Sequence, residues 1–426
     1  MFRNIKKNNS GFMLLGSLSI VIFLSIVLSA AMFSSEMQLK EDTQRNSIQE
    51  AFYAAEAGLD MAIFELRKNS EWRPGEDEQP QVQDVRLNRT LDDDETTVGF
   101  YSVVVKDGGV FNGWETVWIQ SIGRDALNDL TRVVVARAII DSHARFLVST
   151  LGNLRIESRA SINADILGTD VYFEVNPSLE PPENAIYVTG GVFYIRDIYG
   201  EDNPNVFGED DGAITSYKIP SITFAGVNLN RYREIAVELE ASGKGIYHGG
   251  DLTVDLNTLG GLNAAPIIIF AEGDITIFGE YNFSPLVVSS GNIFISGNIE
   301  PDESLPVRPQ IGVFAKKDII ITEDSVSQGG DLSIEAFLIA DGGGDSKGVI
   351  VSEGQGFGTL NFTGAIAARG EGDTAINLNS FATRNYIFNP ALNSDRTIPF
   401  LPFIANIIEW RESTINDTFP PEEPMN

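Results

Sequence analysis

An uncharged stretch near the N-terminus constrains this chain more than any other feature of its sequence. From Phe12 to Ser35 no residue carries a charge, and as a helix these 24 residues are long enough to cross a hydrocarbon core of about 30 Å. Arg3, Lys6 and Lys7 precede the run, and Glu36 closes it. Because basic residues stay on the cytoplasmic side, this order predicts a single-pass protein of the cytoplasmic (inner) membrane, with its N-terminus inside and its C-terminal part extracytoplasmic.

The residues of this segment leave three interpretations open. A secretory signal peptide would be removed after the apolar region, where Ser29-Ala30-Ala31 offers a poor cleavage site. A plain membrane anchor would stay uncleaved. A leader removed ahead of the apolar region would leave that region on the mature protein.

The chain beyond Glu36 continues as a predicted helix. Residues 36–68 contain no proline, and the first proline of the chain is Pro74. Apolar residues alternate four and three positions apart, which places them in one stripe on a helix. They are Ile48, Phe52, Ala55, Leu59, Ala62 and Leu66. We therefore expect one helix over residues 12–68, on the order of 80 Å long, with its first half in lipid and its second half against a globular head.

The N-terminal residues resemble those of type IV pilins. A basic leader (residues 1–11), the pair Gly11-Phe12 and a long apolar helix together resemble the site that prepilin peptidase cuts. The stretch Ala51–Leu59 (AFYAAEAGL) closely resembles the N-terminal region of PilX-type minor pilins. The resemblance implies cleavage after Gly11, N-methylation of Phe12, and assembly with other pilins or pseudopilins.

One position departs from the pattern of that family. Pilins of the major type carry a glutamate at the fifth residue of the mature chain, where this chain has Gly16. In the family, this carboxylate is thought to neutralise the terminal amine of a neighbouring subunit inside the apolar filament core. A buried amine without a partner is costly, so the missing acid favours a tip or minor subunit.

Charge and residue types exclude several classes of function. The chain carries 60 acidic and 30 basic residues, a formal net charge of -30, whereas nucleic-acid binding needs clustered Lys and Arg. It contains no cysteine, which excludes disulfides, thiolate metal sites and cysteine nucleophiles. Histidine catalysis or a zinc site would rest on His143 and His248 alone. We expect no enzymatic activity and no cofactor.

A predicted linker and a small antiparallel sheet follow the helix. Residues 69–97 are polar and include the acidic run at 92–95, which predicts a linker. Residues 98–141 predict an antiparallel β head, a pattern that again resembles the PilX group. Its strand-like runs are 100–105, 116–122 and 132–140, and its predicted turns are Gly108-Gly109 and Asn128-Asp129.

From about Arg145 the chain consists of short apolar strands separated by Gly-Asp or Gly-Asn pairs. A Gly-Asx phrase is such a pair together with the strand that follows it. From Gly250 onward this phrase recurs at intervals of roughly 13–26 residues, which overlaps the periods of parallel β-solenoids. Apolar and polar residues alternate in most copies, so one face of each strand turns inward. Gly and Asx accept the left-handed backbone that corners require. Residues 145–419 therefore predict a β-solenoid-like outer domain, and in layout they resemble uncharacterised solenoid domains that follow PilX-like N-termini. The copies begin at Gly152, Gly250, Gly273, Gly291, Lys317 and Gly330.

Two stretches interrupt this pattern. Residues 197–222 are rich in Gly, Pro and Asp and predict a surface loop. Residues 228–241 predict a helix that caps or flanks the coils, with Gly243 as a stop signal. Calcium binding is an alternative only at the isolated acidic stretches 209–212 and 342–345, because the regular register of calcium repeats is missing. Residues 420–426 predict a disordered tail.

The sequence thus predicts an α+β protein with a long pilin-type helix, an antiparallel β meander and a mostly β outer domain. The expected function is structural: a minor or tip pilin of a type IV pilus or pseudopilus that presents the outer domain at the cell surface. Its expected partners are the lipid bilayer, prepilin peptidase and other pilins. The main alternative is an uncleaved membrane-anchored adhesin that binds a surface glycan or protein. A glycan-active β-helix enzyme is a third possibility, but the sequence singles out no carboxylate pair for it.

Overall fold

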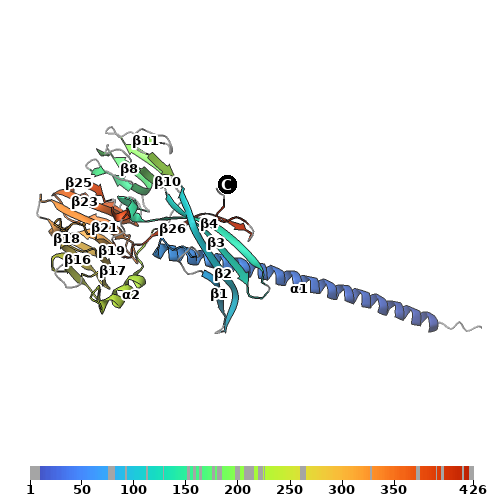
Figure 1. Ribbon diagram of the computed structural model, residues 1–426. Coiled ribbons are helices and arrows are strands. Elements are labelled where there is room, and N and C mark those ends of the chain that lie inside the picture. The colour runs from blue at the N-terminus through green and yellow to red at the C-terminus, as the bar shows by residue number, and fades with distance from the viewer. Residues whose placement is uncertain are drawn as a thin grey trace, which may run out of the picture.

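The computed structural model consists of a projecting helix, a small head sheet and a larger β body (Figure 1). The structure describes residues 10–74, 82–91, 94–111, 114–127, 129–150, the strands between 154 and 218, and residues 224, 226–259, 265–326, 329–370, 375–389, 391–394, 398–414 and 417–421. Side chains are described for these residues except 10–16, 89–95, 154–218 and 393–394.

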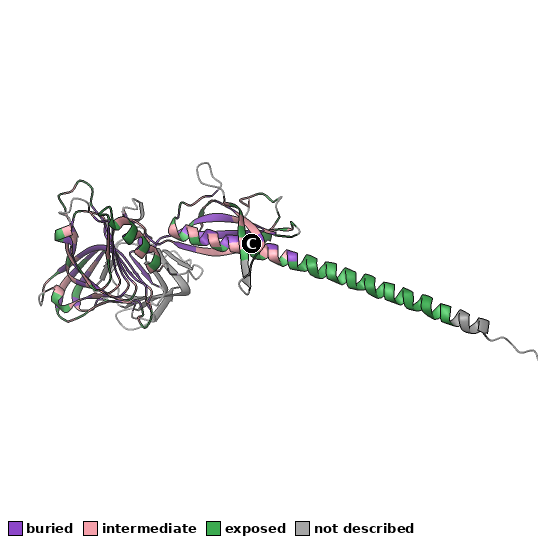
Figure 2. Cartoon of the chain, turned by 90° about the horizontal axis from the view of Figure 1, so that it is seen from below, coloured by how far each residue is buried: buried purple, intermediate pink, exposed green. Residues whose placement is uncertain are grey.

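A single helix, α1, runs from Ser10 to Lys68 without a break over 59 residues. Its described first part projects away from the protein and is exposed, whereas its second part lies on the head sheet (Figure 2). The prediction of one helix through residues 12–68 is confirmed. The second part carries the predicted stripe: Ala55, Leu59, Ala62 and Leu66 are buried, and Ile48 and Phe52 are half-buried.

The head sheet has five antiparallel strands in the order β1-β2-β3-β4-β26. The three predicted strand runs lie within β2, β3 and β4. The strands are β1 (Val82–Leu91), β2 (Asp94–Phe111), β3 (Trp114–Asp125), β4 (Thr131–Asp141) and β26 (Ile404–Ser413).

Two predictions about the head were wrong. The linker expected at 69–97 contains β1 and the start of β2, because β1 is a mostly polar edge strand that is held by its pairing with β2. The turn expected at Gly108-Gly109 is a bulge inside β2, where Gly109 has φ 66° and the register with β3 shifts. At the predicted Asn128-Asp129 turn, Asp129 has φ 59° and lies between β3 and β4, whereas Asn128 lies outside the described residues.

The outer domain is inserted into the head sheet. Strands β4 and β26 are hydrogen-bonded neighbours, yet residues 142–403 separate them in the chain. The predicted boundary of the outer domain at residue 419 was therefore wrong, since β26 completes the head. Residues 417–421 also belong there: Phe419 packs with Trp118, Val133 and Val135 on a second apolar cluster of the sheet. Most of the predicted disordered tail lies outside the described residues.

Helix α1 approaches the head sheet through small residues. Ala51, Ala54 and Ala55 are fully buried in this contact. A Cβ added to Gly123 of β3 would lie 2.0 Å from the carbonyl oxygen of Ala51, and one added to Gly58 would lie 2.3 Å from Ser121 Oγ. Real Cβ atoms do not come this close, so the spacing between helix and sheet depends on glycine at both positions.

The outer domain is built from parallel strands that stack in register in three ladders. The first ladder has central strands, at residues 268–271, 286–289 and 312–315, that are buried on both faces, which explains their continuous apolar runs. It consists of β13 (Gly245–His248), β15 (Ile268–Ala271), β17 (Leu286–Ser289), β19 (Gly312–Ala315), the ends of β21 (Leu332–Ala340) and β23 (Phe357–Ala368), then β5 (Val148–Thr150), β8 (Ile166–Glu174), β10 (Ala185–Arg196) and β12 (Thr215–Lys218).

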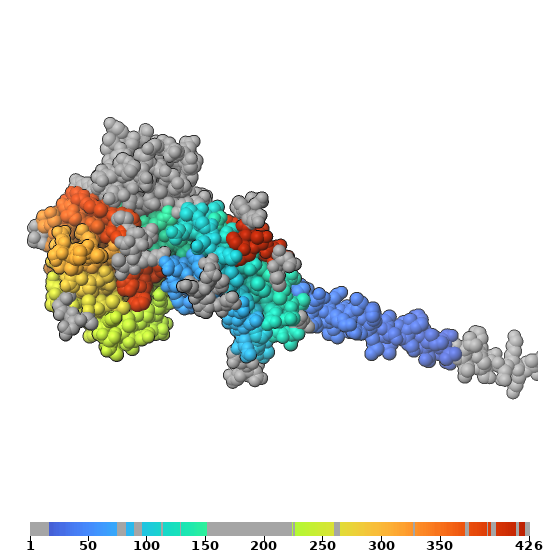
Figure 3. Space-filling view, viewed as in Figure 1, coloured from blue at the N-terminus to red at the C-terminus, as the bar shows by residue number. Residues whose placement is uncertain are grey.

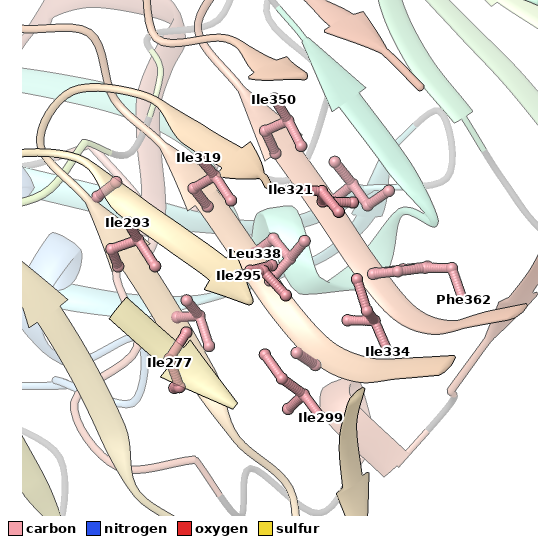
Figure 4. Close-up of a cluster of buried hydrophobic side chains, with 14 of the residues drawn as sticks. Ile277, Ile293, Ile295, Ile299, Ile319, Ile321, Ile334, Leu338, Ile350 and Phe362 are labelled. Atoms are coloured by element: carbon pink, nitrogen blue, oxygen red, sulfur yellow. The ribbon is translucent and has the colours of Figure 1, made fainter. Parts of the chain in front are cut away.

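Where their side chains are described, the other two ladders mostly alternate buried residues with half-buried or exposed ones. In the second ladder, isoleucines at equivalent positions stack on each other, as Ile277, Ile295 and Ile321 do in register (Figure 4). It consists of β14 (Leu252–Asp255), β16 (Ile275–Tyr281), β18 (Ile293–Pro301), β20 (Ile319–Ile321), β22 (Ile350–Ser352) and β24 (Ile376–Asn377). The third joins the far ends of β16 and β18 to the starts of β21 and β23, then β25 (Phe381–Phe388), β7 (Ala160–Ile162) and β9 (Ser178–Leu179).

The order of strands in the stack differs from their order in the chain. Val148 of β5 pairs with Ile366 of β23, so the first strands of the outer domain stack on its last ones. The chain therefore enters the stack in its middle, builds one end, and restarts at the opposite end beside α2 (Figure 1). The loop predicted at 197–222 was wrong in part, because it contains β11 (Asp202–Asn205) and β12. The remaining short elements are β6 (Leu154–Ile156), η1 (His143–Arg145), η2 (Glu323–Ser325), α3 (Leu256–Leu259) and α4 (Ala391–Ser394).

The helix predicted at 228–241 is present as α2 (Leu229–Glu240). The Asn228 side chain caps it by accepting a hydrogen bond from Arg231 N. Tyr232 and Ala236 are buried against the first ladder, and a Cβ on Gly245 of β13 would lie 2.2 Å from Ala236 O. Helix α2 therefore flanks the stack: it lies on the outer face of the first ladder, beside β13 and β15.

The Gly-Asx phrases form the corners of the stack, but not for the reason that the sequence indicated. Asp251 Oδ1 accepts a hydrogen bond from Asp274 N (2.9 Å), and Asp274 Oδ1 accepts one from Asn292 N (2.7 Å). Each rung, meaning one turn of the chain through the ladders, is thereby hydrogen-bonded to the next. A Cβ on Gly291 would lie 2.1 Å from Asp274 Oδ1, while Gly250, which begins the phrase in the β13–β14 rung, has open space around it. Gly273 and Gly291 thus provide room for the side chain of the adjacent rung rather than a left-handed backbone.

We expect Gly123→Ala to lower the free energy of unfolding by about 1–3 kcal/mol, because the added methyl group forces α1 away from β3. Thermal or urea unfolding of the full chain in detergent measures this. Gly249→Ala is the matched control, since a Cβ there meets nothing within 4 Å. Equal stabilities of the two variants would contradict the close contact.

We also expect Gly291→Ala to destabilise the outer domain by about 1–2 kcal/mol, because the methyl group displaces Asp274 from Asn292 N. Gly250→Ala makes the same chemical change in the same phrase at a site without a neighbouring side chain. It should leave the unfolding transition unchanged or slightly stabilised. Loss of stability in both variants alike would show that the corners need glycine for its backbone instead.

Candidate functional site

The most distinctive surface of the described chain is the projecting half of α1. Every described residue from Ser17 to Asn46 is exposed, and none of those before Glu36 is charged. Its large apolar side chains are about half to two-thirds exposed, from 48% at Val27 to 68% at Met32. The helix is long and apolar enough to cross a membrane, and none of its most apolar window is buried in the protein. It is therefore not a core helix of the head, and Figure 3 shows it leaving the body of the molecule uncovered.

The three residues singled out for processing lie in the first turns of this helix. Gly11, Phe12 and Gly16 have helical backbone, but their side chains lie outside the described residues. Cleavage after Gly11 and methylation of Phe12 therefore stay predictions. The tip or minor position that Gly16 favours likewise stays a prediction.

The C-terminal end of α1 is tied to the outer domain. Arg231 Nη2 of α2 donates to Lys68 O (3.3 Å), one of the carbonyls that the helix end leaves unpaired. Arg67 binds the segment through which the chain returns from the outer domain to β26. Its Nη2 donates to Ala405 O (3.2 Å), and Phe403 N donates to Arg67 O (3.3 Å). The helix, head and outer domain are therefore connected by hydrogen bonds as well as by the two chain segments that follow β4 and precede β26.

A cavity of about 1050 Å³ lies at this junction, between the head and the outer domain. Its charged lining is balanced, with three cations and three carboxylates. Asp141 is buried there and pairs with Arg145 Nη1 at 2.6 Å. Burial raises the pKa of Asp141, and the Arg145 pair partly offsets this rise. The charged residues are Lys68, Arg145, Arg231, Glu71, Glu115 and Asp141.

His143 lies in η1, just after β4, where the chain enters the outer domain, and its side chain is 1% exposed. Its Nδ1 lies 2.6 Å from Ser149 Oγ, and its ring lies 4.5 Å from that of Phe224. Burial lowers the pKa of His143 from 6.5 to about 3. The residue is therefore a neutral packing residue between η1 and the first ladder. Sequence reasoning considered it only as a catalyst or ligand. His248 is exposed at the end of β13.

The structure brings together carboxylates that the sequence did not pair. Glu280 of β16 and Glu300 of β18 are register partners, and Ile299 pairs with Ile334, which places Glu335 on the next strand of the same row. A cleft of about 560 Å³ runs beside them. The sequence hides this register, because the number of residues from each Gly-Asx pair to its glutamate differs from rung to rung.

Glu335 is the best buried carboxylate of this row, and Arg308 Nη2 binds its Oε2 at 2.6 Å. Burial raises the pKa of Glu335, the Arg308 pair lowers it, and the nearby charges of Glu300 and Glu303 raise it further. The cleft could hold a cationic or hydroxyl-rich group. Among the described residues, no group of three or more His, Asp or Glu is placed to hold a metal ion. The acidic stretch 209–212 lies outside them.

No protein-family model matches the chain, and no curated protein matches it. Among solved structures it is similar to the crystal structure of the competence-associated pilin ComZ from Thermus thermophilus, with 13% sequence identity over 85% of this chain and 97% of that chain. The TM-score is 0.31, which is too low to establish a common fold.

We expect the stability of the chain to fall between pH 6.5 and pH 3 through His143. An unfolded histidine binds a proton below about pH 6.5, whereas the folded one does so only below about pH 3, so the unfolded state holds more protons in between. The free energy of unfolding should fall by about 2 kcal/mol more in the wild type than in His143→Asn between pH 6.5 and 5. Urea unfolding of both proteins at each pH measures the difference. Parallel pH curves would contradict the neutral, buried state of His143.

Proposed function

We propose that this chain is a structural, non-enzymatic subunit of a type IV pilus or pseudopilus, and within it a minor or tip pilin of the PilX-like kind. The observation that carries this proposal is the division of α1 into two halves. One half is apolar and exposed to the surroundings, and the other is fixed to a five-stranded sheet by small residues. A helix of this form supports a subunit that is held in the bilayer by its first half and displays a folded domain outside it.

In this proposal the leader of residues 1–11 is cut off by prepilin peptidase, and Phe12 becomes the methylated N-terminus. The apolar half of α1 then contacts lipid or the helices of other pilins. Gly16 supports a tip or minor position, because such a subunit needs no acid for the amine of a neighbour. The N-terminal side faces the cytoplasm and the acidic bulk lies outside.

We further propose that the three parallel ladders make up a β-solenoid that serves as the displayed domain. In-register stacking of isoleucines and Asx side chains from rung to rung supports this reading. The acidic row of Glu280, Glu300 and Glu335 is its candidate contact surface for a glycan or protein. Arg308 already occupies one oxygen of Glu335, which supports a binding rather than a catalytic role.

An uncleaved membrane-anchored adhesin is the alternative function. It uses the same helix as an anchor and the same outer domain as a binding surface. The two functions differ at the N-terminus, since only the pilin requires processing ahead of the apolar run.

We expect the native protein, isolated from membranes, to begin at N-methylated Phe12. Intact-mass measurement and N-terminal sequencing read this directly. In cells without prepilin peptidase, the same protein should begin at Met1 and keep its leader.

Each other start site has its own meaning. A start at Met1 in cells with active peptidase would replace the pilin proposal by the anchored adhesin. A start beyond Ala31 would mean that the apolar run is a removed signal peptide, and that the outer domain is exported without an anchor.

A further inference from the structure

The turn between β3 and β4 lies at the end of the head that faces the apolar half of α1. Strand β3 runs along the helix in the opposite direction: Ser121 lies beside Gly58, and Gly123 lies beside Ala51. Beyond the strand, Leu130 lines a groove with residues of α1 between Glu36 and Gln44. Each step along β3 thus leads toward the uncharged run, and the turn that follows Asp125 comes closest to it.

Hydrogen bonds and ion pairs join the described residues on the two sides of this turn. Asp125 is 2% exposed, its N donates to Leu130 O (3.0 Å), and its Oδ1 accepts from Leu130 N (2.6 Å). Arg124 pairs with Asp129 at 2.9 Å and with Asp84 of β1 at 3.2 Å. Leu127 follows Asp125 by two residues in this turn.

Leu127 is 82% exposed, more than any other large apolar side chain in the described part of the protein. Leu39 of α1, at 65% exposure, faces the same groove of about 450 Å³ as Leu130. Two ion pairs lie beside them, Lys40 with Glu36 (3.1 Å) and Arg124 with Asp129 (2.9 Å). Exposed leucines beside neutralised ion pairs suit the boundary between lipid and water.

The distance along α1 places the groove at that boundary. The 24 uncharged residues measure about 36 Å as a helix, slightly more than a hydrocarbon core of about 30 Å. The headgroup layer adds roughly 5–8 Å on each side. The groove begins at Glu36, the first residue after the run, so its near end falls within the headgroup layer when the run spans the bilayer. Its far end at Gln44, about 12 Å further along α1, lies beyond that layer.

We infer that the β3–β4 turn is a membrane-docking element of the head. With α1 inserted, Leu127 enters the headgroup layer, and lipid fills the groove between Leu39 and Leu130. The inference rests on the membrane insertion of α1 in the proposed function and adds a second contact with the same bilayer. Two contacts fix the tilt of the head, and hence the direction in which the outer domain points.

The absence of cysteine from the sequence allows a direct test with single nitroxide labels. The full chain carrying Leu127→Cys is reconstituted at low protein density in vesicles of phosphatidylethanolamine and phosphatidylglycerol. Collision of the label with oxygen and with a water-soluble nickel chelate reports its depth. Val307→Cys, at a site 73% exposed on the outer domain, is the water-facing control, and Leu24→Cys in the apolar run reports insertion.

We expect the Leu24 label to lie in lipid and the Leu127 label to be several-fold less accessible to nickel than the Val307 label. A lipid-embedded Leu24 label with an open Leu127 label would overturn the docking inference and leave membrane insertion intact. A water-exposed Leu24 label would remove insertion and docking together. Shielding of Leu127 that appears only at high protein density would assign the groove to another copy of the chain and overturn the inference as well.

Discussion

The close contact between α1 and β3 is the constraint on which the rest of the structure depends. Ala51, Gly58 and Gly123 let two backbones approach to a distance that no larger side chain permits. Because an approach this tight has one register, it fixes where along the helix the head begins. It thereby fixes which residues of α1 remain uncovered, and it points the β3–β4 turn toward the apolar run. The opposite end of the same helix meets the outer domain at Lys68.

The insertion of the outer domain between β4 and β26 gives the head a second structural role. A domain attached by one linker can swing, whereas one that leaves and re-enters through adjacent hydrogen-bonded strands has both ends held within one strand spacing. Arg67 and Arg231 add hydrogen bonds across the junction. Position along α1 and orientation of the outer domain are therefore coupled, although a large polar cavity lies between them.

The sequence predicted those features that local patterns encode. The helix followed from an uncharged run and a 3.6-residue stripe, and β2, β3 and β4 from apolar alternation. Strand β26 could not be assigned to the head, because its partner β4 lies far away in the chain and no local pattern links the two strands. The stacking of β5 on β23 was hidden for the same reason. The row of Glu280, Glu300 and Glu335 depends on that stacking, so no candidate contact surface could be read in advance.

The corner phrases show how one residue pattern can be recognised correctly and explained incorrectly. Glycine before Asx indicated a left-handed backbone, yet at Gly273 and Gly291 the structure shows a need for space. The carboxylate or amide of one rung satisfies a backbone N–H of the next, so the polar corner is paired within the protein. A stack held in this way can carry a strongly acidic surface without cations at its corners, since the corner carboxylates already have donors. The corner carboxylates therefore contribute to the folding of the outer domain through these hydrogen bonds.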